Sequence, residues 1–300
     1  MDSAEEIKIP VPWGYICGKW WGPRVKQPLL ALHGWQENAG SFDRLIPLFP
    51  DHISVLCIDL PGHGRSSHYP KGQFYYLFWD GVLVVRRIVK HFRWKRVSIM
   101  GHSLGGAIGF LYAASFPDEV EKLICFDIVH PSVRDLSRTV NETGQCIDKF
   151  LEYENMKEAG KPCYVYNDMI DLVWDTYRGS LTRECCEVLM KRGMAPAYRA
   201  FSEDTTQYQF CRDARLKIAG MGALTIDLVL EYASKIRCEY LNIKGIPGMK
   251  FDHPENYFLV LDKIKKTAKH FEFYEVEGTH HFHINTPELI SSYVIDFLSR

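Results

Sequence analysis

The feature that most constrains this chain is a short apolar run that ends in a glycine-rich turn. Residues 97–100 lead into residues 101–105, Gly-His-Ser-Leu-Gly, which have the pattern G-x-S-x-G. In a nucleophile elbow, an apolar strand delivers a serine to a strained turn, and flanking glycines let the strand and the next helix approach closely. The alternative is a glycine-rich turn without chemistry, because the pattern alone recurs by chance. We expect a strand, a turn with Ser103 at its apex, and a helix.

A serine at this position needs donors for the charge that forms when it attacks an acyl carbon. The backbone N–H of Leu104 and the positive end of the following helix favour such an oxyanion. A second N–H must come from a loop beside the turn. His33-Gly34-Trp35 directly follows another apolar run, and its glycine lets the loop fold close to the serine. Leu104 and Trp35 are therefore the predicted oxyanion hole.

A histidine cluster near the C-terminus supplies the candidate base. In residues 276–283 an apolar strand ends, Gly278 permits a turn, and His280, His281 and His283 follow before the last helix. Histidine can take and return a proton near neutral pH. We choose His280, with His281 as the fallback. A metal site is the alternative, but no carboxylate or cysteine stands at a ligand spacing beside the cluster, so we expect no metal.

The rhythm of apolar segments predicts an α/β fold. Residues 7–21 alternate apolar and polar side chains, which indicates an opening hairpin. Apolar runs at 29–33, 53–59, 97–100 and 122–127 are each followed by a turn and a helix-length segment. Such near-continuous apolar strands are typical of a parallel sheet covered on both faces. Helices are expected from Ser41, over 76–92 and over 104–115.

The strand rhythm stops between residues 130 and 227 and then resumes. The interrupted stretch carries helix-like amphipathic patches and scattered aromatic residues. Strands are expected again at 239–244 and 271–276, with helices over 255–270 and from Thr286, where Thr would cap and Pro287 would open the helix. We therefore predict a core of residues 1–129 and 228–300 with a helical cap inserted at 130–227.

Composition narrows the function by exclusion. The 36 Lys and Arg residues nearly balance the 37 Asp and Glu residues, which argues against nucleic acid or an anionic membrane as partner. The nine cysteines show no C-x-x-C spacing, which suits reduced thiols inside the cell. The N-terminus lacks a secretory signal and no apolar run is long enough to span a membrane. We expect a soluble, cytoplasmic protein, and association with vesicles or peroxisomes is compatible with the sequence.

Taken together, four motifs resemble those of the α/β-hydrolase superfamily. They are H-G-W at 33–35, D-L-P-G-H-G-R-S at 59–66, G-H-S-L-G-G at 101–106 and G-x-H at 278–280, in the family order. Residues 38–43 and 66–69 resemble the serine hydrolase-like (Kraken-type) branch. The resemblance covers all but the cap. It implies an eight-stranded, mostly parallel sheet with helices on both faces, a helical cap, and a serine hydrolase without cofactor.

The resemblance leaves two candidates for the acid that orients the histidine. Asp252 lies in the loop where the family usually places its acid, although it also fits a D-x-x-E capping box with Glu255. Asp127 ends the strand that follows the elbow helix, where the haloalkane-dehalogenase-like branch carries its acid. Its alternative role is to organise the loop that leads into the cap. Relatives that open epoxides or cleave carbon–halogen bonds use an aspartate nucleophile, so Ser103 argues against both reactions.

The cap is expected to shape the substrate pocket. Its aromatic and methionine side chains suggest an apolar chamber; they are Tyr164, Tyr166, Trp174, Tyr177, Tyr198, Phe201, Met156 and Met169. We expect a carboxylesterase-type serine hydrolase whose partner is a small or medium apolar ester. Two alternatives are a ligand-binding protein on a hydrolase scaffold and a cofactor-free Ser/His enzyme of carbon–carbon or oxygen chemistry. The sequence makes no prediction of the oligomeric state.

Overall fold

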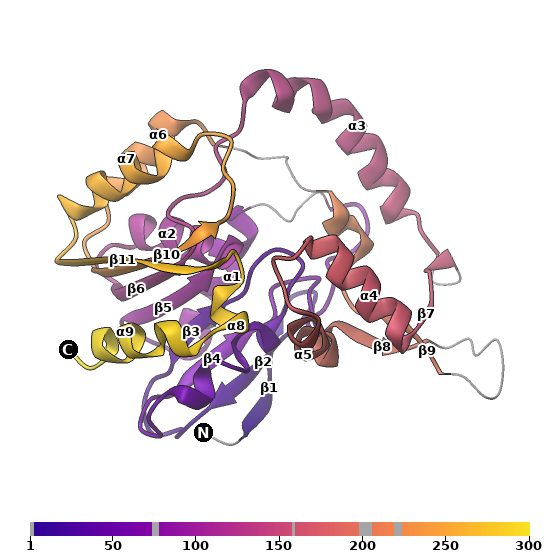
Figure 1. The fold of residues 1–300 in the computed structure, drawn as a ribbon, viewed down its shortest axis with the longest axis horizontal. Helices are drawn as coiled ribbons and strands as arrows, with labels where there is room; N and C mark the ends of the chain where they lie inside the picture. The colour runs from indigo at the N-terminus through magenta and orange to yellow at the C-terminus, as the bar shows by residue number, and fades with distance from the viewer. Residues whose placement is uncertain (1–2, 74–77, 158–159, 198–205, 219–223) are drawn as a thin grey trace.

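An eight-stranded sheet forms the centre of the protein (Figure 1). The computed structural model describes residues 3–73, 78–157, 160–197, 206–218 and 224–300. The strand order is β1-β2-β4-β3-β5-β6-β10-β11. The strands are β1 (Ala4–Val11), β2 (Gly14–Trp21), β3 (Leu29–Leu32), β4 (Val55–Ile58), β5 (Val97–His102), β6 (Val120–Phe126), β10 (Glu239–Gly248) and β11 (His270–Thr279). β2 pairs antiparallel with β1 and β4, and the pairs from β4 to β11 are parallel. The predicted hairpin and mostly parallel sheet are confirmed.

Both faces of the sheet are covered by helices, as an apolar parallel sheet requires. In β3, Leu30 and Leu32 belong to one core cluster, while Leu29 and Ala31 belong to the other. The first cluster includes α1 (Phe78–His91), α2 (Leu104–Ser115), α6 (Ile226–Ala233) and α7 (Pro254–Lys265). The second includes α9 (Glu288–Leu298). Alternate side chains of one strand therefore pack against opposite layers. In Figure 1, α6 and α7 lie above the sheet and α9 lies below it.

Several predicted helices differ in their boundaries. The helix expected from Ser41 is replaced by two 3-10 turns, η1 (Ala39–Phe42) and η2 (Ile46–Leu48). Gly40 and Pro47 both disfavour a continuous α-helix there. Of the helix predicted over 76–92, residues 76 and 77 lie outside the described residues. α2 begins and ends where the sequence predicts.

The capping role expected for Thr286 is wrong. α9 begins at Glu288 with Pro287 as its N-cap residue, and no side chain caps it. The hydroxyl of Thr286 instead lies 3.4 Å from the carbonyl oxygen of Phe282, to which it donates. It therefore closes the preceding short helix α8 (Phe282–Asn285) rather than opening the last one.

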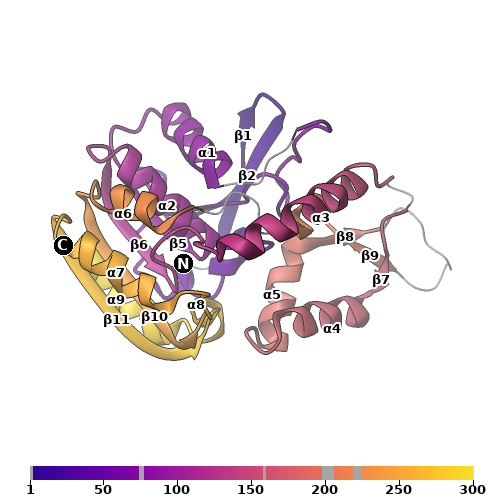
Figure 2. The same cartoon turned by 90° about the horizontal axis from the view of Figure 1, so that it is seen from above.

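The segment between β6 and α6 contains, in its described residues, a small sheet as well as helices. Its helices are α3 (Leu136–Glu154), α4 (Tyr166–Tyr177), α5 (Arg183–Gly193) and the 3-10 turn η4 (Ala214–Lys217). Its strands are β7 (Tyr164–Val165), β8 (Met194–Pro196) and β9 (Gln207–Phe210), in the antiparallel order β7-β9-β8. A purely helical cap was therefore the wrong expectation, because strands this short show no periodic pattern. α4, α5 and the small sheet form a lobe beside the core, and α3 leads to it (Figure 2).

A buried ion pair fastens this lobe to the core. Nε of Arg192, in α5, lies 2.9 and 2.7 Å from the two carboxylate oxygens of Asp59, which follows β4. The two side chains are 5% and 0% exposed. Asp59 also accepts hydrogen bonds from the backbone N–H groups of Ala39 and Arg65. Removing the guanidinium would leave this carboxylate buried without its counter-charge.

We predict that Arg192→Met lowers the free energy of unfolding by about 3–5 kcal/mol, because it leaves the buried Asp59 carboxylate without its counter-charge. The neighbouring Lys191 is exposed, so Lys191→Met is the matched control and should change stability by less than about 0.5 kcal/mol. Urea unfolding of both variants measures the difference. Equal effects of the two substitutions would contradict the account of this contact.

Candidate active site

The backbone around Ser103 has the strained geometry of a nucleophile elbow. Ser103 has φ 49° and ψ −114°, between the end of β5 and the first residue of α2. Side chains other than glycine rarely adopt a positive φ. A Cβ on Gly105 would lie 2.0 Å from the carbonyl oxygen of Leu32, and one on Gly101 would lie 2.3 Å from the carbonyl carbon of Gly105. Strand and helix therefore approach closely enough to exclude any side chain at these two positions.

The loop that carries Trp35 is held beside this turn. Trp35 and Leu104 line the same small cavity, so the structure brings together the two residues predicted to donate to an oxyanion. The ring of His33 fixes the start of the loop. Its Nε2 accepts the backbone N–H of Leu60 at 3.0 Å, and its Nδ1 lies 2.7 Å from the carbonyl oxygen of Gly34. Burial lowers the pKa of His33, in keeping with a neutral scaffold residue.

The carboxylate that contacts His280 belongs to Asp127. Nδ1 of His280 lies 2.7 Å from Oδ2 of Asp127, which is fully buried directly after β6. The same carboxylate accepts the backbone N–H of Gly245 at 2.8 Å and that of Met249 at 2.6 Å. The backbone of His280 is also tied to the elbow, because Nε2 of His102 lies 2.9 Å from the His280 carbonyl oxygen.

The structure does not bring Asp252 to His280. Its carboxylate is 42% exposed and lies 3.9 Å from a guanidinium nitrogen of Arg138. Nor does it form the capping box, since α7 has His253 as its N-cap residue and no side-chain cap. Of the two candidate acids, only Asp127 is within hydrogen-bond distance of the imidazole.

Gly248 explains why an aspartate on the neighbouring strand can reach this position. Gly248 ends β10, which runs parallel to β6. Its φ is +58°, and a Cβ there would lie 2.6 Å from Oδ1 of Asp127. A side chain at residue 248 would therefore occupy the space that the Asp127 carboxylate fills.

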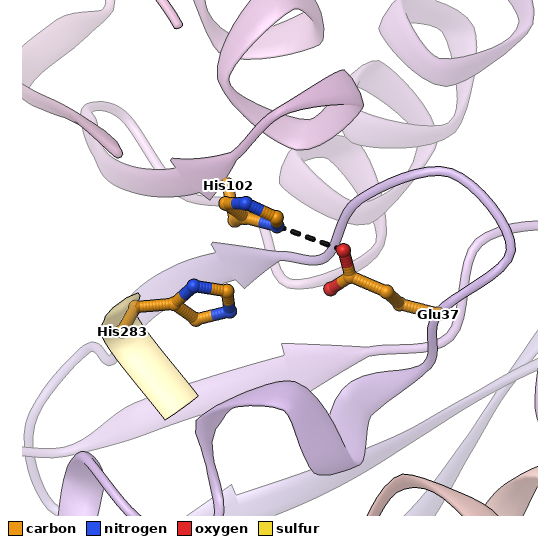
Figure 3. Close-up of side chains that lie close together, drawn as sticks. All are labelled: Glu37, His102 and His283. Carbon is orange, nitrogen blue, oxygen red and sulfur yellow. Dashed lines mark ion pairs between the residues drawn. The ribbon is translucent and has the colours of Figure 1, made fainter. Parts of the chain in front are cut away.

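Behind the elbow lies a buried carboxylate that sequence reasoning missed. Oε1 of Glu37 lies 2.8 Å from Nδ1 of His102 (Figure 3). The same oxygen lies 3.3 Å from Nε2 of His281. Oε2 accepts the backbone N–H of Gly34 at 3.1 Å and the hydroxyl of Ser41. Burial alone would raise the pKa of Glu37, but His102 and His281 hold it well below its usual value. No spacing rule links residues 37, 102 and 281, so only the fold shows this cluster.

His281 is unsuited to the role of fallback base. It is 4% exposed, and its Nδ1 lies 2.6 Å from the hydroxyl of Ser180 in the cap. Its Nε2 is the nitrogen that faces Glu37, so both ring nitrogens have partners. Burial lowers its pKa. His281 therefore joins the cap to the Glu37 cluster, while His280 faces Asp127.

Glu37, His102 and His283 have side chains of the types that bind metals, and their donor atoms lie within 4.8 Å of one another. Their geometry favours a different interpretation. The rings of His102 and His283 stack with centroids 4.0 Å apart and an angle of 30°. An imidazole binds a metal in the plane of its ring, and two stacked rings do not aim their nitrogens at one point. We therefore describe the group as a buried carboxylate in contact with His102, with the ring of His283 stacked on that histidine.

A pocket of about 570 Å³ lies between the loop at residues 35–38 and the cap. Tyr164 and Tyr177 line it, as the sequence suggests, whereas Tyr166 and Trp174 are exposed. Met169 is buried in the cap's own core. Tyr198 and Phe201 lie outside the described residues. The predicted aromatic chamber is thus formed by some of the named side chains and not by others.

Comparison with known proteins identifies the class. A family model for the alpha/beta hydrolase fold matches residues 27–150, the part that carries the elbow and Asp127. The structure of the hypothetical protein PA1622 from Pseudomonas aeruginosa superposes with a TM-score of 0.82 at 28% identity, covering 99% of this chain and 100% of that one. A thioesterase domain from the curacin biosynthetic pathway has a TM-score of 0.76 at 21% identity and covers 98% of this chain and 100% of its own, which shows the shared fold.

Two curated relatives narrow the class to a family. A probable serine hydrolase of Drosophila melanogaster is 51% identical over 299 residues, which are 100% of this chain and 89% of the relative. Human serine hydrolase-like protein 2 is 34% identical and covers 98% of this chain and 93% of its own. The chain therefore belongs to the serine hydrolase-like branch of the α/β hydrolases. Over the described residues, none of the helices is long and apolar enough to cross a membrane.

We predict that the buried ring of His283 makes stability fall in mild acid. Burial and then the charge of His102 hold its pKa well below the usual value. Below about pH 6.5 the unfolded chain binds a proton that the folded chain does not, so this group lowers stability by about 1.4 kcal/mol per pH unit as the pH falls. His283→Phe should flatten the slope of stability between pH 7 and pH 5 by about one proton.

Chemical denaturation at a series of pH values measures this slope. The exposed His52 is the control, and His52→Gln should leave the slope as it is. An unchanged slope in His283→Phe would show that this ring is not held neutral in the folded protein.

Proposed function

We propose that this protein is a serine hydrolase that cleaves carboxylic esters with Ser103, His280 and Asp127. The observation that carries the proposal is the 2.7 Å contact between His280 and a fully buried aspartate. His102, the residue before the positive-φ Ser103, ties the His280 backbone to the elbow. A carboxylate only accepts hydrogen bonds, so it favours the imidazole tautomer with its proton on Nδ1. Nε2 is then the basic nitrogen, as a serine nucleophile requires.

The proposed reaction has two halves. Oγ of Ser103 attacks the acyl carbon while Nε2 of His280 takes its proton, and the backbone N–H groups of Trp35 and Leu104 stabilise the oxyanion. The same proton passes to the leaving alcohol, which leaves an acyl-enzyme. Water then gives a proton to His280 and attacks the acyl carbon. The bond between the acyl carbon and Oγ of Ser103 breaks, Oγ takes that proton back from Nε2 of His280, and the carboxylic acid leaves. Asp127 keeps the ring oriented and stabilises its charged form in both halves.

A non-catalytic binding protein on this scaffold is favoured only by the irregular loop after β10. That loop begins with Met249, whose backbone N–H donates to Asp127, and Gly245, in β10, donates to the same carboxylate. The irregularity is therefore compatible with a complete set of catalytic groups. No contact among the described residues favours carbon–carbon cleavage or oxygen chemistry over ester hydrolysis.

Labelling by a fluorophosphonate tests the nucleophile. Ser103→Ala should abolish both labelling and turnover of p-nitrophenyl esters of graded chain length, because no oxygen remains to attack. Ser115→Ala removes an exposed serine at the other end of α2 and should behave as wild type. Circular dichroism checks that both variants fold. Labelling that survives in Ser103→Ala would refute the assignment.

Replacing each aspartate separately tests the acid. Asp127→Asn should lower kcat by about 10³- to 10⁴-fold, because an amide no longer favours the Nδ1–H tautomer or stabilises the imidazolium. Asp252→Asn should leave kcat within about threefold of wild type, since the ion-pair partner of its half-exposed carboxylate in the described part of the chain is the exposed Arg138. A larger loss in Asp252→Asn than in Asp127→Asn would reverse the choice.

A further inference from the structure

The pocket beneath the cap carries a positive charge that the proposed reaction does not use. Trp35, whose backbone N–H is proposed to face the oxyanion, forms part of its wall, so the pocket adjoins the site of chemistry. Arg212, two residues after the end of β9, lines the same pocket beside Tyr164, Tyr177 and Phe210. A substrate that reaches Trp35 would therefore pass close to this guanidinium.

Arg212 is partly buried, and its partners differ from those of the two buried arginines of the cap. Arg192 is paired with Asp59, and Arg215 is paired with Asp213. The guanidinium of Arg212 lies over the ring of Phe210, 3.9 Å from its centroid. Across the described ranges, no carboxylate or carbonyl oxygen lies within hydrogen-bond distance of it. The N–H groups of this guanidinium can therefore donate hydrogen bonds to a ligand in the pocket.

The surroundings of Arg212 disfavour the positive charge of its guanidinium. Burial lowers the pKa of Arg212, and the nearby polar groups are the phenols of Tyr177 and Tyr164. Glu37 also lines the pocket, but its carboxylate is engaged by His102 and His281. Lys217 adds a second, exposed cation at the pocket wall. A buried cation without a counter-charge is unfavourable, and an anionic ligand would remove that penalty.

We propose that this pocket binds a carboxylate carried by the substrate, with Arg212 as its partner. The inference rests on the proposed function and narrows it: the substrate is an ester that bears a carboxylate on an otherwise apolar or aromatic body. A guanidinium presents paired N–H donors that match the two oxygens of a carboxylate. One guanidinium balances one negative charge, which suits a monoanion. This differs from the wholly apolar ester that the sequence suggests.

A matched pair of esters tests the proposal by turnover. Monoethyl adipate and ethyl hexanoate differ chiefly in carrying a carboxylate or a methyl group at the far end of the acyl chain. Wild type should prefer the adipate ester in kcat/KM. Arg212→Met should lower that preference by about 10- to 100-fold, the usual worth of a charged hydrogen bond. Lys191→Met removes an exposed cap cation outside the pocket and should keep the preference unchanged.

A binding measurement separates this proposal from the catalytic one. In Ser103→Ala, which cannot turn the ester over, calorimetric titration should detect monoethyl adipate, and adding Arg212→Met should weaken that binding by a similar factor. Arg212→Lys keeps the charge and should retain part of it. If the protein hydrolyses no ester but binds monoethyl adipate through Arg212, the catalytic proposal is wrong. The proposal of an anion site at Arg212 would still hold. Ester turnover with no Arg212-dependent preference, or equal loss on both esters, would overturn the anion site alone.

Discussion

The site depends on one buried carboxylate at the end of β6. Asp127 receives hydrogen bonds from the backbone of Gly245, in β10, and of Met249, directly after β10. Its Oδ2 lies 2.7 Å from the imidazole of His280 after β11. A carboxylate removed from water is stable only when its oxygens are satisfied in this way. The contact therefore fixes two loops as well as a side chain, and it requires that residue 248 be glycine, because a Cβ there would lie 2.6 Å from the carboxylate.

Parallel strands explain how residues far apart in the sequence meet. In an open α/β sheet, the loops that follow the carboxyl ends of parallel strands lie along one edge. Trp35 follows β3, Ser103 follows β5, Asp127 follows β6 and His280 follows β11, and these strands lie in the order β3-β5-β6-β10-β11. Glu37 connects two of these loops, since its carboxylate contacts His102, next to Ser103, and His281, next to His280. The proposed catalytic residues and the residues that contact Glu37 thus lie along one edge of the sheet.

The pattern of residues within one segment was enough to predict the elements whose structure depends on that segment alone. The elbow, the bounds of α2 and the opening hairpin follow from residues within one short segment. The choice between Asp127 and Asp252 could not be made this way, because both follow strands and the outcome depends on the space left by Gly248 on a neighbouring strand. Glu37 and Arg212 are likewise single charged residues whose surroundings come from several segments. The cap strands β7, β8 and β9 are too short to show any alternation.

The tautomer of His280 tests the central claim most directly. Nuclear magnetic resonance of protein with ¹⁵N-labelled histidine, with the ring assigned through His280→Gln, reports which nitrogen carries the proton in the neutral ring. We predict that the neutral ring of His280 carries its proton on Nδ1 with a strongly downfield resonance, because that proton lies in a hydrogen bond to the Asp127 carboxylate. A neutral ring with its proton on Nε2 would contradict it, since that nitrogen could then not act as the base for Ser103.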